Sequence, residues 1–130
     1  MKYQGTTNKL IDSKDRFEWS NESMLKAKNI IKKYPLGREQ SAVIPLLDLA
    51  QRQNKGWLNK KALEKVAETL SMSFIRVLEV ATFYSMFNTM PVGRHNVAIC
   101  TNISCMLRGA DEIVDHVEKK LGIKIGDSTA

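Results

Sequence analysis

The chain has 130 residues, of which 43% are hydrophobic and 26% charged, a composition typical of one ordinary soluble domain. No apolar run approaches the roughly 18 residues of a membrane-spanning helix, and the first 18 residues lack the apolar region of a signal peptide. Two cysteines are too few for a secreted disulfide scaffold, so a reducing cytoplasm is the expected compartment.

The net charge of +6 is unevenly distributed along the chain. Residues 1–65 hold 14 Lys and Arg against 7 Asp and Glu, whereas residues 66–130 hold 6 against 7. A basic half of this kind can dock on nucleic acid, on an acidic membrane surface or on an acidic protein. A solvated lysine-rich face is the plainer interpretation, and the helical segments favour it.

Helical signals dominate the sequence up to Phe87, after a polar segment over residues 1–16 that is expected to be flexible. Helices are predicted after four capping residues, Ser20, Ser41, Asn59 and Ser73, with stops at Pro35 and Gly56. The last of the four, over residues 74–87, is apolar nearly all round, which predicts a position in the middle of a bundle.

After residue 87 the pattern changes to a turn-rich connection, a short apolar run and one more helix. NVAIC at 96–100 predicts a buried strand, and residues 104–121 predict a helix that ends at Gly122. The remaining IKIGDSTA is at most one more short strand. Because one strand and one helix cannot close a sheet-based core, the sequence is expected to stop within a domain.

The only two cysteines, Cys100 and Cys105, are expected to face one crevice, at the end of the strand and in the first turn of the helix. There the positive end of the helix dipole favours thiolates. The loop between them supplies backbone N–H groups that can donate to sulfur. Four side chains are expected to add hydrogen bonds or positive charge, and such surroundings suit an anionic iron–sulfur cluster: Thr101, Asn102, Ser104 and Arg108. The C-x4-C spacing also matches the first gap of plant-type 2Fe–2S ligation.

Taken alone, this pair of cysteines leaves other interpretations open. Two structural thiols are the commonest case, a dithiol redox pair is another, and a zinc site would need two further ligands. His95 and His116 are expected at the surface rather than in the crevice. No glycine-rich phosphate loop and no Ser/His/Asp arrangement is present in the sequence.

Six phrases occur together and in order: FEWS at 17–20, YPLGREQSAVIPLLDLAQ at 34–51, GWL at 56–58, EVATFYSMFN at 79–88, PVGRH at 91–95 and CTNISCMLRGADEI at 100–113. In these phrases the chain closely resembles the family of E subunits of NADH–quinone oxidoreductase, the small 2Fe–2S subunits of respiratory complex I. The resemblance implies an α+β fold. A four-helix bundle over 17–90 would precede an incomplete thioredoxin-like ferredoxin domain over 91–130, with only its first strand and helix present.

The resemblance further implies that Cys100 and Cys105 are the first two of four cluster ligands. In the family a C-x3-C pair follows a segment like GDST at 126–129, so that pair is expected beyond Ala130. The 130 residues alone are therefore expected to hold no stable 2Fe–2S cluster. The unpaired edge of the strand at 96–100 would allow the fragment to self-associate.

The resemblance places NADH and FMN on a larger partner subunit, within the peripheral arm of complex I on the cytoplasmic side of the bacterial inner membrane. Neither nucleic-acid binding nor membrane insertion is expected. Two alternatives are the equivalent subunit of an NAD-linked hydrogenase or formate dehydrogenase, and a basic helical interaction or nucleic-acid-binding module with structural cysteines.

Overall fold

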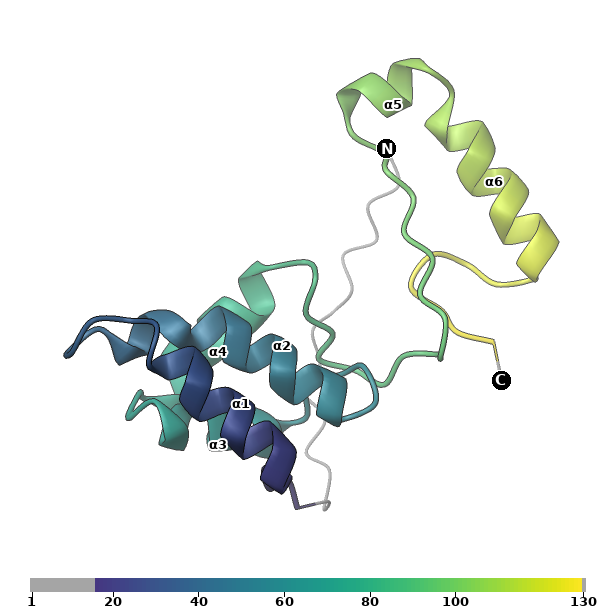
Figure 1. Cartoon of the computed structure of the whole chain (residues 1–130). Helices are drawn as coiled ribbons and strands as arrows, with labels where there is room; N and C mark the ends of the chain where they lie inside the picture. The colour runs from purple at the N-terminus through teal and green to yellow at the C-terminus, as the bar shows by residue number, and fades with distance from the viewer. Residues whose placement is uncertain (1–15, 130) are drawn as a thin grey trace. The chain divides into compact units, whose positions relative to one another are not determined.

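The computed structural model describes residues 16–129, which form α-helices, one 3-10 turn and irregular segments (Figure 1). The segment predicted to be flexible, residues 1–16, lies outside the described residues except for Arg16. The described residues divide into two compact units, with the boundary between Val92 and Gly93. None of the helices within 16–129 is long and apolar enough to cross a membrane.

Residues 16–92 contain four α-helices and the 3-10 turn. Their bounds are α1 Asn21–Ile31, η1 Glu39–Ala42, α2 Val43–Gln53, α3 Lys60–Thr69 and α4 Phe74–Phe83. Helices that follow one another in the chain pack on one another, and α2 also contacts α4. Since α2 contacts α1, α3 and α4, it lies at the centre of this unit.

Capping explains where two of these helices begin. Ser20 Oγ accepts the Ser23 N–H at 3.1 Å, and Asn59 Oδ1 accepts the Ala62 N–H at 2.7 Å, so both predicted N-caps are confirmed. Ser73 occupies the N-cap position of α4 but makes no side-chain cap hydrogen bond. The predicted cap at Ser41 is wrong, because that residue lies inside η1 and α2 begins two residues later.

The end of α2 differs from the prediction by one residue. Lys55 and Gly56 both adopt left-handed backbone angles, with φ of 57° and 89°, and the Gly56 N–H donates to the Gln51 carbonyl at 2.8 Å. Lys55 therefore occupies the position predicted for Gly56, and the glycine comes next in a Schellman-type ending. The backbone thus turns directly from α2 into α3.

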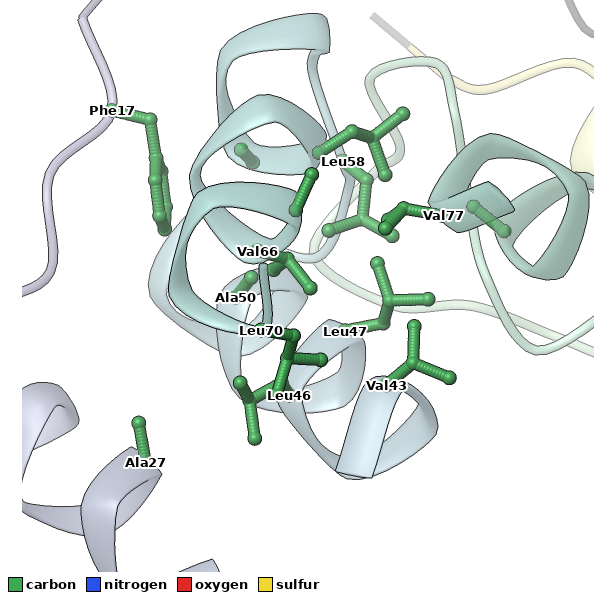
Figure 2. Close-up of a cluster of buried hydrophobic side chains, with 14 of the residues drawn as sticks. Phe17, Ala27, Val43, Leu46, Leu47, Ala50, Leu58, Val66, Leu70 and Val77 are labelled. Atoms are coloured by element: carbon green, nitrogen blue, oxygen red, sulfur yellow. The ribbon is translucent and has the colours of Figure 1, made fainter. Parts of the chain in front are cut away.

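The core of this unit is built mainly from α2 and α3, with Val77 of α4 turned toward Leu47 and Leu58 (Figure 2). The largest fully buried apolar side chains are Leu46, Leu47, Leu58, Leu63, Val66 and Val77. Each such side chain contributes on the order of 1.5–3 kcal/mol when it is removed from water. The core therefore fixes the mutual positions of α1 to α4.

The segment before α1 is tied to α3. Phe17 and Trp19 are buried and meet edge to face with their ring centroids 5.4 Å apart. The Trp19 Nε1–H donates to Thr69 Oγ1 at 2.9 Å, which gives the buried indole a partner for its only polar group. Lys65 of α3 forms an ion pair with Glu18 at 2.9 Å.

The predicted central position of α4 is wrong. The helix buries Val77 and Ala81, but Ile75 remains 56% exposed and Phe83 79% exposed. The helix also ends at Phe83 rather than at residue 87, because Tyr84 adopts an extended backbone with φ −88° and ψ 122°. Apolar residues all around a helix predicted burial on every side, but the described chain covers only one side.

Residues 93–129 contain two helices, α5 Ile103–Leu107 and α6 Ala110–Leu121, and no strand. The strand predicted over 96–100 does not form. These residues are irregular and mostly exposed, because no other described segment pairs with their backbone. The described residues are thus helical rather than α+β. Ala110 is the one buried side chain between 93 and 129.

The single helix predicted over 104–121 is divided at Arg108 and Gly109. Gly109 has a φ of 91°, which only glycine adopts readily, and it turns the chain between α5 and α6. The predicted ending at Gly122 is confirmed, because Gly122 is the left-handed C-cap of α6 and its N–H donates to the Glu118 carbonyl at 2.9 Å. The second unit is therefore a pair of helices joined by a glycine turn.

Candidate metal centre

The two cysteines lie on either side of the start of α5. Cys100 ends the irregular segment, and Cys105 is the third residue of the helix. Asn102 occupies the N-cap position, where its Oδ1 accepts the Ile103 N–H at 2.7 Å and its carbonyl accepts the Met106 N–H at 2.8 Å. The turn at Asn102 reverses the chain and brings the second cysteine back toward the first.

Both thiols are free and exposed, and each shifts the pKa of the other, which indicates that they are near neighbours. The pKa of Cys100 lies below its usual range because the Asn102 N–H donates to its sulfur, with a further contribution from the Cys105 thiol. The pKa of Cys105 lies above its usual range because the neighbouring Cys100 sulfur and the negative charge that develops on it favour the protonated thiol.

The group that lowers the pKa of Cys100 most is the backbone amide of Asn102, rather than one of the predicted side chains. Within residues 16–129, the side chains of Thr101, Ser104 and Arg108 make no hydrogen bond to either cysteine, and the Asn102 side chain is engaged at Ile103. Thr101 is half-buried, whereas Ser104 and Arg108 are exposed. The predicted roles of these four side chains around a cluster stay predictions.

The helix dipole at the cysteines is weaker than the sequence predicted. The helix that contains Cys105 has five residues, because Gly109 ends it, instead of the eighteen that the sequence predicted. A dipole of so few peptide units is weak. The Asn102 N–H is consequently the main source of stabilisation for negative charge on Cys100.

A 2Fe–2S cluster takes four thiolates in its commonest form. Two neighbouring exposed thiols, with a backbone N–H that lowers the pKa of one of them, suit two of these four positions. His95 and His116 are both exposed, as predicted. In the part of the chain that the structure describes, no group of three or more Cys, His, Asp and Glu side chains is arranged to hold a metal ion. The pair therefore fits half of a cluster ligand set.

Comparison with known proteins identifies the family of the chain. Residues 27–130 match the family described as "Thioredoxin-like [2Fe-2S] ferredoxin", and the chain belongs to this family. The match begins in α1 and covers residues of both compact units. The fold class thus includes the thioredoxin-like 2Fe–2S domain that the resemblance implied.

More particularly, the chain is similar to E subunits of NADH-quinone oxidoreductase. It is 51% identical to that of Rickettsia typhi over 113 residues, which cover 87% of this chain and 66% of the relative. It is 50% identical to that of Rickettsia conorii, with 68% of the relative covered. It is also 45% identical to the mitochondrial "NADH dehydrogenase [ubiquinone] flavoprotein 2" of Dictyostelium discoideum, with 46% covered. The predicted resemblance is confirmed, and the chain spans about two thirds of the length of its bacterial relatives.

Proposed function

We propose that this chain is the small electron-transfer subunit of an NADH–quinone oxidoreductase, with Cys100 and Cys105 as two of the ligands of a 2Fe–2S cluster. The observation that carries the proposal is a pair of free, exposed thiols, near enough to shift each other's pKa, in a chain of the 2Fe–2S family. The names of the relatives support the oxidoreductase complex as its setting.

The two cysteines have unequal parts in ligation. Thiolates, not thiols, bind iron, so the lowered pKa of Cys100 favours the form that binds. A bound metal would favour the thiolate form of Cys105, whose pKa is raised by the neighbouring Cys100. The Asn102 N–H then remains directed at the Cys100 sulfur, where such hydrogen bonds raise the reduction potential of a cluster.

When bound, a 2Fe–2S cluster supplies a centre that takes up and returns one electron. NADH and FMN are proposed to bind a partner subunit, with these cysteines near its flavin, as the family resemblance implies. Thr101, Ser104 and Arg108 are proposed to tune the potential from around the loop. The chain is proposed to belong to the peripheral arm, on the cytoplasmic side of the bacterial inner membrane.

Four thiolates require two cysteines more than these 130 residues contain. The 130-residue chain alone is therefore proposed to hold the cluster poorly, since ligand number determines much of the stability of a metal site. Val97, in the segment 96–100, is 64% exposed, and this segment is proposed to be the site through which the isolated chain self-associates.

The test is co-expression with the flavin- and NADH-binding subunit, using a chain of the full length of the relatives. The purified pair should be coloured, and NADH should bleach its visible absorbance. Cys100→Ser and Cys105→Ser should each remove most of the colour, whereas Ser104→Ala in the same loop should keep it. A colourless wild-type pair would refute ligation, and a coloured pair that NADH leaves unchanged would refute the electron-transfer role.

A further inference from the structure

A groove of about 410 Å³ lies between α1 and α2, away from the cysteines in the chain. One face of each helix lines it, at the i, i+4, i+7 spacing of a helical stripe. The side chains that matter here are Lys26 and Ile30 from α1, Lys33 from the turn that follows it, and Pro45, Leu49 and Arg52 from α2. The core beneath holds the two helices together, so the groove is a fixed feature of this unit.

The floor of the groove is apolar. Ile30 and Leu49 are half-buried and pack against the hydrophobic core, so each leaves part of its side chain open to the groove. Pro45 adds a third apolar surface that carries no backbone N–H. A bound side chain without charge would gain contact here at the expense of water.

The rim of the groove is cationic. Lys26, Lys33 and Arg52 line it, but Glu22 forms an ion pair with Lys26, and the groove itself holds one carboxylate, Asp48. That carboxylate accepts the Arg52 Nε–H at 2.8 Å, which leaves the remaining guanidinium N–H groups of a side chain that is 75% exposed. Lys33 is exposed and makes no ion pair with any residue in the range 16–129. The groove thus offers more positive charge than its own residues neutralise.

We propose that this groove binds an acidic segment of a partner protein, with an apolar side chain on the floor and carboxylates at Lys33 and Arg52. Charge complementarity selects this occupant. A second copy of a chain with net charge +6 would bring like charges together, and no aromatic side chain lines the groove for stacking with nucleic-acid bases. Only the identity of the protein that supplies the segment rests on the proposed function.

Lys28 provides a matched control for Lys33. Both are exposed lysines of one chain segment, but Lys28 does not line the groove. Lys33→Glu should therefore weaken recognition of an acidic segment, whereas Lys28→Glu makes the same change in net charge away from the groove. Circular dichroism of both variants would show that the helices are kept.

The first experiment does not depend on the proposed function. A peptide that alternates glutamate pairs with leucine is titrated into the isotope-labelled 130-residue chain and followed by amide chemical shifts. The shifts should gather at Ile30, Lys33 and Leu49. Lys33→Glu should weaken binding about tenfold, and Lys28→Glu should weaken it less than about twofold. Replacing the leucines by serine should also weaken binding.

The second experiment uses the complex with the flavin- and NADH-binding subunit. A carbodiimide, which joins amines to carboxylates in contact, should link Lys33 to an Asp or Glu of that subunit and should not link Lys28. The proposal is overturned if the peptide fails to bind, if the two variants weaken binding equally, or if a short DNA duplex binds more tightly with the same dependence on Lys33. If the peptide binds but the chain forms no complex with the flavin- and NADH-binding subunit, the proposal about the groove stands and the proposed function is refuted.

Discussion

Replacing Asn59 by alanine should destabilise the helical unit by about 2 kcal/mol. Asn59 is 2% exposed, and its Oδ1 accepts the N–H of Ala62, which is fully buried. Loss of an N-cap typically costs about 1 kcal/mol, and a buried N–H left without an acceptor costs about 1–3 kcal/mol. Water cannot easily reach the Ala62 N–H, so the effect should lie in the upper part of the N-cap range of about 0.5–2 kcal/mol.

Urea unfolding at 25 °C measures this effect, and thermal unfolding provides a second measure. For a unit of about 60–100 residues, 1 kcal/mol shifts Tm by about 4–8 °C, so Asn59→Ala should lower Tm by about 8–16 °C. Ser73→Ala is the control, because Ser73 caps α4 only by position and should change stability by less than about 0.5 kcal/mol. Asn59→Ser, which keeps an acceptor oxygen, should recover part of the loss. Equal shifts for Asn59→Ala and Ser73→Ala would refute the account of capping.

Three further predictions concern packing, backbone strain and charge. Leu47→Ala should cost about 2–5 kcal/mol in urea unfolding because Leu47 is fully buried, while Leu36→Ala, at a residue 97% exposed, should cost less than about 0.5 kcal/mol. Gly109→Ala should destabilise the α5–α6 turn by about 1–2 kcal/mol, because alanine is strained at a φ of 91°. The loss should appear as faster amide hydrogen exchange in α6, and unchanged exchange would show that this backbone strain is absent. Hydrogen bonds to Glu18 and to a second glutamate raise the pKa of Lys65, so their stabilisation is present below the ordinary lysine pKa of about 10.4 and is lost as pH rises through the raised value. The stability difference between wild type and Lys65→Met should therefore shrink at strongly alkaline pH, and a difference that stays constant would contradict the ion pair.

The sequence predicted best what depends on a few neighbouring residues. The caps at Ser20 and Asn59 and the ending at Gly122 follow from side-chain chemistry within one helical turn, and the structure has all three. The break at Gly109 is also local, but the apolar stripe on both sides of it favoured one continuous helix. A glycine inside a helical pattern can be accommodated or can end the helix, and periodicity does not distinguish the two.

What the sequence could not predict depends on distant partners. The apolar run at 96–100 has the composition of a strand, but a strand forms only when another segment pairs with it. Burial of α4 on all sides likewise requires neighbours that local pattern cannot reveal, and Phe83 remains exposed.

The candidate site shows the same division. Cys100 and Cys105 are recognisable from their spacing and from the family resemblance. The hydrogen bond from the Asn102 backbone, however, depends on a turn that side-chain chemistry alone does not specify. The groove depends on bringing Lys33, just after α1, close to Arg52 of α2, so a count of charges along the sequence could indicate only a basic half.

The central claim is that Cys100 and Cys105 bind a 2Fe–2S cluster. Its most direct test is anaerobic reconstitution, with iron and sulfide, of a chain of the full length of the relatives, followed by electron paramagnetic resonance of the reduced protein. The account predicts the signal of one 2Fe–2S cluster per chain, lost or altered in Cys100→Ser and in Cys105→Ser and retained in Ser104→Ala. A full-length chain that binds no iron and sulfide, or a signal that both serine variants leave unchanged, would contradict it.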